Sequence, residues 1–310
     1  MENKAVKADL LLLLTAGIWG FAFVAQRVGM DYVGPYTYNA LRFALGSLSL
    51  LPLIYLSTRK RRRQQPELPK GNGRAILVGG LIAGLALFAG SSFQQVGLVY
   101  TTAGNAGFIT GLYVVMVPLL GLFWKQRPTA GTWVGAVLAA TGLYFLSVTE
   151  DLTLKPGDFL VLISAFFWSV HVLVIGWLSP KMDSLKLSSV QFAVCSLLSL
   201  LVALAIETLS LASILAATMP ILYGGLFSVG IAYTLQVVAQ RHAHPAHSAI
   251  ILSLEGSFAA LGGWLLLGEI LSPQGLLGCG LMLSGMILSE LSNYLFKKPQ
   301  TLGRLAARLP

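Results

Sequence analysis

The sequence contains little charge. Only 11% of its 310 residues are Asp, Glu, Lys or Arg, whereas roughly 25% is usual for soluble domains. Hydrophobic residues make up 55% of the chain, and the mean hydropathy is +0.76. A water-soluble enzyme is therefore excluded. The net charge of +9 does not indicate nucleic-acid binding, because the basic residues lie between apolar runs rather than on one solvated face.

Cysteines and reaction motifs are also scarce. Cys195 and Cys279 both lie inside apolar segments, which excludes a disulfide framework or a thiolate metal site. The chain has no GxSxG, HExxH or P-loop string, so a hydrolase, a metalloprotease and an ATP-driven pump are disfavoured. His242, His244 and His247 could together bind zinc or nickel, but the turn is short and offers no nearby carboxylate. We therefore expect no enzyme activity, no cofactor and no metal site.

Long apolar runs dominate what remains. A membrane span needs about 20 apolar residues, and runs of this length must be helices because lipid offers the backbone no hydrogen bonds. We mark ten runs, at residues 7–28, 36–56, 74–96, 101–124, 129–148, 157–177, 188–207, 219–240, 246–268 and 274–295. The sequence therefore predicts an all-α integral membrane protein with ten transmembrane helices.

The loops between these runs differ in charge. With the N-terminus inside, 18 of the 21 Lys and Arg residues fall in cytoplasmic segments, as the positive-inside rule requires. We therefore expect both termini, including a tail at 297–310, to be cytoplasmic. The basic run is expected to touch anionic lipid headgroups through Arg59, Lys60, Arg61, Arg62 and Arg63.

A weak internal repeat divides the chain into a first half, 7–148, and a second half, 157–296. Trp19 and Trp168 are 149 residues apart, and at the same offset RFALGSL aligns with QFAVCSL. Later in each half the offset becomes 143, which pairs Leu112 with Glu255. Each half holds five spans, and because five is odd the halves cross the membrane in opposite senses. Such an inverted repeat suits alternating access, although duplication could also serve only to build a stable bundle.

Three segments resemble the EamA family of the drug/metabolite transporter superfamily. They are TAGIWGFAFVAQRVG, YNALRFALGSLSLLPL and SAIILSLEGSFAALGGWLLLGEILSPQGLLGCGLMLSGMIL. The resemblance implies a ten-helix secondary transporter of the bacterial inner membrane, often an exporter of amino acids or other small metabolites. It also implies a central cavity between helices one, three, four, six, eight and nine.

The resemblance extends to single residues. The Arg-Phe of the second helix corresponds to Arg42 and Phe43, and the acidic residues of the ninth helix correspond to Glu255 and Glu269. Many members have Pro after the first of these acidic residues, where this chain has Gly256. Because Pro kinks a helix, the resemblance leaves open whether the ninth helix bends here.

Arg42 and Glu255 are the two ionisable residues well inside a span, where burying a charge is costly. Glu255 lies about 13 Å along its helix, near the membrane midplane. It could bind a proton or the amine of a substrate, or it could form a structural ion pair with Arg42 or a hydrogen bond between helices. Arg42 could likewise serve only in pairing, or could extend to the outer interface.

A second group of polar and aromatic residues could line the cavity. Aromatic walls with a few amide and hydroxyl groups suit small metabolites, although each residue could equally be core packing or join two helices. The group consists of Trp19, Gln94, Asn105, Tyr113, Trp168, His171, Tyr233, Gln236 and Ser248.

The sequence therefore predicts a secondary active transporter that moves a small metabolite, such as an amino acid, by alternating access. Export is the expected direction, and coupling to protons is an open part of this prediction. The alternative is a polar-lined channel, or a lipid or solute facilitator without ion coupling. The working unit is expected to be a monomer or a homodimer.

Overall fold

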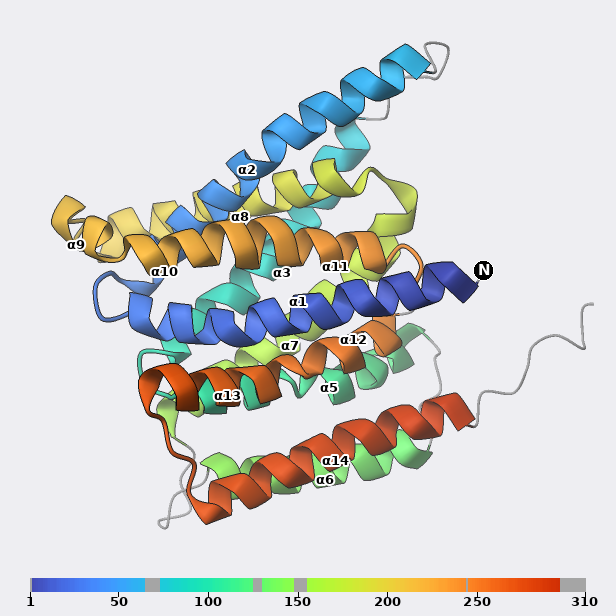
Figure 1. Cartoon of the computed structure of the whole chain (residues 1–310), viewed down its shortest axis with the longest axis vertical. Coiled ribbons are helices and arrows are strands. Elements are labelled where there is room, and N and C mark those ends of the chain that lie inside the picture. The colour runs from blue at the N-terminus through green and yellow to red at the C-terminus, as the bar shows by residue number, and fades with distance from the viewer. Residues whose placement is uncertain (1, 65–72, 125–129, 148–154, 244, 296–310) are drawn as a thin grey trace, which may run out of the picture.

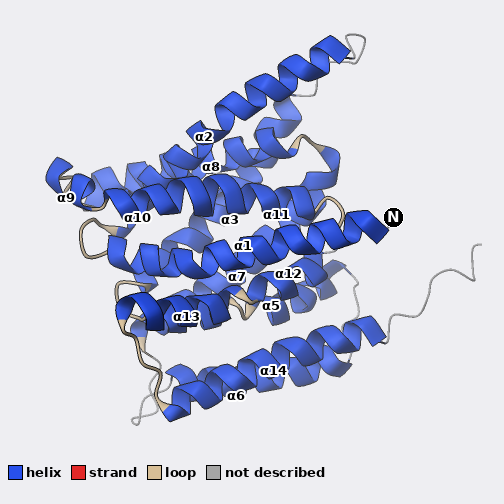
Figure 2. Ribbon diagram, in the orientation of Figure 1, coloured by secondary structure: helices blue, strands red, loops and turns tan. Residues whose placement is uncertain are grey.

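The computed structural model describes residues 2–64, 73–124, 130–147, 155–243 and 245–295. All regular elements of this part of the chain are helices, as Figure 2 shows. The all-α prediction is thus confirmed for the described residues.

The helices follow the apolar runs closely. Four of them begin with Pro, whose fixed φ and missing N–H suit the first helical position. The longer elements are α1 (Glu2–Gly29), α2 (Pro35–Gln64), α3 (Gly73–Gly97), α6 (Ala130–Ser147), α7 (Pro156–Leu178), α8 (Ser184–Ile206), the π-helix η3 (Tyr223–Tyr233), α13 (Glu255–Leu267) and α14 (Pro273–Leu295). The shorter ones are α4 (Ala103–Thr110), α5 (Tyr113–Gly121), η1 (Leu122–Trp124), η2 (Ser179–Lys181), α9 (Leu211–Ala216), α10 (Thr218–Leu222), α11 (Thr234–Ala239) and α12 (Pro245–Ser253).

Eight stretches of the described residues are long and apolar enough to cross a membrane. They are Val6–Gly29, Pro35–Lys60, Gly73–Gly97, Ala103–Gly121, Pro156–Lys181, Ser184–Ile206, Thr218–Ala239 and His247–Leu267. Helix α6 contributes a shorter apolar segment, Trp133–Gly142. The chain is therefore a multi-pass helical membrane protein.

Two of these spans are interrupted. α4 and α5 are separated by Gly111 and Leu112, and α12 and α13 are separated by Leu254. At each interruption an amide bonds to the third residue back instead of the fourth, as in Leu112 to Ile109 (3.1 Å) and Leu254 to Ile251 (3.3 Å). The ninth predicted span is thus broken immediately before Glu255, although Gly256 replaces the family's Pro.

Glycines explain how the two broken spans approach each other. A Cβ at Gly256 would lie 3.0 Å from the carbonyl oxygen of Gly107 and 3.1 Å from Cα of Phe108. Only glycine permits backbones to pack this closely. Close helix packing therefore explains the glycine at position 256, independently of any kink.

Helices from the two ends of the sequence are interleaved. α2 packs on α8, α3 on α7 and α8, α4 on α13, and α6 on α14, while α1 contacts α13 and η3. Figure 1 shows α6 and α14 side by side at one edge of the bundle. The interior between the other helices is therefore lined by residues far apart in the sequence.

Candidate functional site

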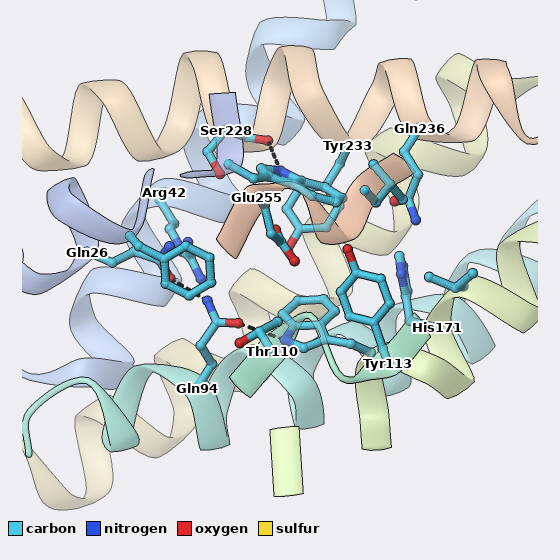
Figure 3. A pocket seen from close by; sticks show the side chains of 15 residues that line it. Gln26, Arg42, Gln94, Thr110, Tyr113, His171, Ser228, Tyr233, Gln236 and Glu255 are labelled. Atoms are coloured by element: carbon cyan, nitrogen blue, oxygen red, sulfur yellow. Dashed lines mark hydrogen bonds between the residues drawn. The ribbon is translucent and has the colours of Figure 1, made fainter. Parts of the chain in front are cut away.

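An enclosed pocket lies among α1, α2, α3, the two broken spans, α7 and η3 (Figure 3). Its cavity volume is only about 30 Å³. This is room for about two water molecules, so a larger solute requires the walls to move apart. The lining comprises Trp19, Phe23, Gln26, Arg42, Gln94, Thr110, Tyr113, Trp168, His171, Val172, Ser228, Tyr233, Gln236, Leu252 and Glu255.

The pocket brings together most of the residues that the sequence singled out. Arg42 and Glu255 are joined there by Trp19, Gln94, Tyr113, Trp168, His171, Tyr233 and Gln236. Asn105 and Ser248 are buried, 7% and 0% exposed, but are not part of this lining. The role of each residue stays a prediction, whereas their meeting in one pocket is a structural fact.

A chain of amide hydrogen bonds fixes one wall. The indole Nε1 of Trp168 donates to Oε1 of Gln94 (2.7 Å), and Nε2 of Gln94 donates to Oε1 of Gln26 (2.9 Å). Nε2 of Gln26 then donates to the carbonyl oxygen of Ala22 (3.1 Å). Each of the two side-chain amides uses both its oxygen and its nitrogen in these bonds. The orientation of each amide in the wall is therefore fixed.

Aromatic rings form the opposite wall around Tyr233. Its ring centroid lies 4.5 Å from that of Trp19 and 6.0 Å from that of Trp168, within the range of favourable aromatic pairs. Trp19 in turn donates to the carbonyl oxygen of Ser228 (3.2 Å) in η3. A π-helix is rare and commonly marks functional positions, and here it carries both Ser228 and Tyr233 into the pocket.

Glu255 occupies the break between α12 and α13. Its side chain is 4% exposed, and Figure 3 shows its carboxylate facing the hydroxyl of Tyr113. Tyr113 lies at the corresponding break between α4 and α5. Among the described residues, Glu255 forms no ion pair with Arg42, so a direct pairing of these two charges is not what holds either residue in place.

Arg42 is 1% exposed and is held by its own helix. Its Nε donates to Oδ1 of Asn39 (2.9 Å), and its Cζ lies 4.8 Å from the ring centre of Phe43 and 5.4 Å from that of Tyr38. These contacts leave Nη2 buried without a hydrogen-bond partner. The guanidinium is therefore held in one orientation, but its hydrogen-bond donors are not all used.

Other buried polar atoms of the pocket also lack a partner. They are Oγ1 of Thr110 and Oε1 of Gln236. Buried polar groups are normally hydrogen-bonded, and exceptions indicate a bound water, ion or ligand. Unpartnered atoms also occur elsewhere among the described residues, such as Oγ of Ser92 and Oε1 of Gln95, so their place in a pocket is what makes these atoms candidates for contact with a ligand.

His171 lies at the same end of the pocket as Gln236 (Figure 3). Its Nε2 is 2.9 Å from Oε1 of Gln191, the residue that the repeat aligns with Arg42. In the repeat predicted from the sequence, the neutral amide of Gln191 takes the position of the cation Arg42.

Sequence reasoning missed three polar residues of the lining, namely Gln26, Thr110 and Ser228. Gln26 could have been found, because Trp19, Phe23 and Gln26 recur at spacings of four and three on one helix face. Thr110 and Ser228 could not, since their positions depend on the helix break and on the π-helix.

Two carboxylates connect helices at the end of the bundle away from the N-terminus (Figure 1). Glu207 accepts bonds from the backbone amides of Tyr36 and Thr37, both at 2.8 Å, at the start of α2. Glu269 accepts from the amides of Ala103 (2.8 Å) and Gly104 (3.0 Å) at the start of α4. Helix N-termini attract negative charge, so these bonds fasten late segments to early ones and close this end of the bundle.

The remaining expectations concern surface groups. No cluster of metal-binding side chains occurs among the described residues, and His244 lies outside them. His247 instead contacts Asp9 at 2.8 Å. Arg59 and Lys60 are exposed on α2, while the side chains of Arg61, Arg62 and Arg63 and the tail at 297–310 lie outside the described residues.

The fold and the pocket together define a class: a helical multi-pass membrane protein that encloses a polar pocket between interleaved helices. The comparison with known proteins is specific. The chain belongs to the EamA-like transporter family, whose model matches residues 6–148 and 155–291.

Relatives agree with this assignment. An uncharacterized transporter of Archaeoglobus fulgidus is 33% identical over 93% of this chain and 87% of its own length. The threonine/homoserine exporter RhtA of Escherichia coli K12 is 27% identical over 91% and 90% of the two chains. A solved crystal structure with 17% identity covers 93% of this chain and 98% of its own, with a TM-score of 0.67, which supports the fold alone.

Proposed function

We propose that the protein is a secondary active transporter that binds a small metabolite in the enclosed pocket and moves it by alternating access. The observation that carries this proposal is the pocket itself, which groups unpartnered polar atoms with aromatic rings between helices of both halves. The exporter RhtA supports an amino acid or a related solute as cargo and export as the direction.

Ten spans in two inverted five-helix repeats are the architecture of this proposal, with α6 and α14 as the fifth and tenth spans. The family model matches the chain in two successive segments, which supports the halves 7–148 and 157–296. Helices at equivalent places also pack together, such as α2 with α8 and α6 with α14. The break before Leu112 and the break before Glu255 fall at positions that the repeat pairs.

The membrane orientation follows the distribution of basic residues. We place both termini in the cytoplasm and the protein in the bacterial inner membrane, with the basic end of α2 against anionic headgroups. Figure 1 shows this end of α2 extending beyond its neighbours. One chain encloses the whole pocket, so a monomer is sufficient, and a homodimer would add no residue to the site.

Glu255 is the proposed proton site. It is a carboxyl group at the centre of a span, at a helix break, and beside a tyrosine hydroxyl. Proton release from Glu255 and solute binding in the same pocket would couple the two movements, because the charge on this carboxyl group changes the affinity of the pocket for the solute.

Transport in proteoliposomes tests the proposal. The protein should show saturable counterflow of threonine, homoserine or a related amino acid, and an acidic lumen should drive uptake as protons leave. The variant Glu255→Gln should retain counterflow and lose the effect of the pH gradient. The control Asp31→Asn removes an exposed carboxylate that pairs with Arg27 at 2.9 Å, and should behave like wild type.

The alternative is a channel or a facilitator without coupling. Solute flux that does not saturate and shows no counterflow would favour the channel and overturn the carrier. Counterflow with an unchanged pH response in Glu255→Gln would retain the carrier and remove Glu255 as the proton site.

A further inference from the structure

Arg42 is a buried cation without a counter-ion. Its side chain is 1% exposed, and among the described residues it has no carboxylate within ion-pair distance. Proteins normally pair a buried charge because leaving it alone is costly. A permanently charged guanidinium in this position therefore indicates that its partner arrives from outside the chain.

The surroundings of Arg42 hold it in one orientation. Nε bonds to Asn39, whose Nδ2 in turn donates to the carbonyl oxygen of Ser91 at 3.1 Å in α3. Cζ of Arg42 lies over the rings of Phe43 and Tyr38. Only the Nη edge stays available, and Figure 3 shows it beside Gln26 and Gln94 at one end of the pocket.

The pocket also has a second polar end. Figure 3 shows Gln236 and His171 on the side away from Arg42, with Glu255 between the two ends. Oε1 of Gln236 is an unpartnered acceptor, whereas Nη2 of Arg42 is an unpartnered donor. A ligand that satisfied both atoms would therefore present an acceptor group to Arg42 and a donor group to Gln236.

We propose that Nη2 of Arg42 binds a carboxylate group of the transported solute, an inference that rests on the carrier function proposed above. Arg42 is the only Lys or Arg among the described residues of the lining, and Glu255 shares the pocket. One cation matches one negative charge, and the neighbouring acid opposes a dianion such as a phosphate monoester. The rest of the solute lies against the ring of Tyr233 and extends toward Gln236.

Thermal unfolding of the purified protein tests this binding without requiring transport. The probes are threonine, homoserine and lactate, each compared with its own amide, together with phosphoethanolamine, which has a phosphate but no carboxylate. We expect at least one acid to raise the unfolding temperature and its amide not to do so. In Arg42→Gln the apparent Kd of that acid should rise at least tenfold. The unfolding temperature of this variant without ligand should stay near that of wild type.

Two further variants keep the test decisive. Arg27→Gln removes a partly exposed cation outside the pocket, and it should respond to the acid as wild type does. If Arg42→Gln does not fold, Arg42→Lys decides, since it keeps the charge but loses the planar fork and should weaken the acid several-fold.

Three results overturn the proposal: an acid and its amide acting equally, an acid effect that persists in the Arg42 variants, or no acid acting on the wild type. Preference for phosphoethanolamine over every acid would overturn the carboxylate and indicate a phosphate in its place. Acid binding without counterflow would instead overturn the carrier function and leave this site intact.

Discussion

At the scale of single residues, the bond between Trp168 and Gln94 joins α7 to α3 across the pocket. Trp168→Phe removes the indole N–H and leaves Oε1 of Gln94 without its 2.7 Å partner. An unsatisfied buried acceptor costs about 1–3 kcal/mol. We therefore expect the KM for counterflow to rise roughly 5- to 150-fold, the factor that corresponds to about 1–3 kcal/mol.

Ser248→Ala provides the matched control. Ser248 is fully buried, and its hydroxyl lacks a partner, like Oγ1 of Thr110 in the pocket. It does not itself line the pocket. The KM of Ser248→Ala should therefore stay within about twofold of wild type, which corresponds to a free-energy change well below 1 kcal/mol. A larger effect in Ser248→Ala than in Trp168→Phe would place the solute elsewhere.

The sequence predicted the pocket residues where polarity alone was informative. Arg42 and Glu255 stand out because charge is rare inside an apolar run, and Trp19 and Trp168 because the repeat pairs them. Asn105 and Ser248 show the same signals, yet the structure places them outside the lining. Polarity within a span thus identifies buried groups, but only the packing decides which of them face the pocket.

At the scale of helices, the apolar runs predicted the spans but not their interruptions. The fourth and ninth runs are continuous in hydropathy, and their breaks at Leu112 and Leu254 are local changes in backbone bonding. Close contact between Gly107 and Gly256 is a property of two helices together, so neither run reveals it by itself.

The contact between α3 and α8 can be tested through glycine. A Cβ added at Gly84 would lie 2.7 Å from the side chain of Val194 and 3.0 Å from the carbonyl oxygen of Gln191. Gly84→Ala should therefore destabilise the protein by about 1–3 kcal/mol, seen as a lower unfolding temperature in detergent. Gly17→Ala is the control, because its Cβ would meet no atom within 4 Å.

In the control, Ala is the better helix former, so Gly17→Ala should be neutral or slightly stabilising. Equal unfolding temperatures for both variants would show that α3 and α8 do not pack as closely as described.

The carboxylate of Glu207 holds the start of α2 by three bonds, including one of 2.6 Å from the hydroxyl of Thr37. In Glu207→Gln an NH₂ group replaces one acceptor oxygen, which costs about 1–3 kcal/mol. That end of the bundle should then open more often. We expect a thiol introduced by Thr110→Cys to react several-fold faster with a reagent applied from that side.

The baseline for this labelling is the parent protein, whose Cys195 and Cys279 are both buried. An unchanged labelling rate would mean that the Glu207 bonds do not control access to the pocket.

At the scale of the whole molecule, the sequence predicted a bundle of apolar helices, which the described residues confirm, while the duplicated pattern stays a prediction. It did not predict how narrow the pocket is, with a cavity volume of only about 30 Å³. That property depends on side chains from many helices meeting at one place. A pocket this narrow requires its walls to move apart before a solute larger than a few water molecules can enter or leave.

The central claim is that access to the pocket alternates between the two membrane faces. It is tested most directly by linking Tyr36→Cys to Glu207→Cys with a short bismaleimide, because the Tyr36 amide and the Glu207 carboxylate meet at 2.8 Å. We predict that counterflow in proteoliposomes stops after linking, whereas either single variant treated in the same way continues to exchange solute. Undiminished counterflow in the linked protein would contradict alternating access through this pocket.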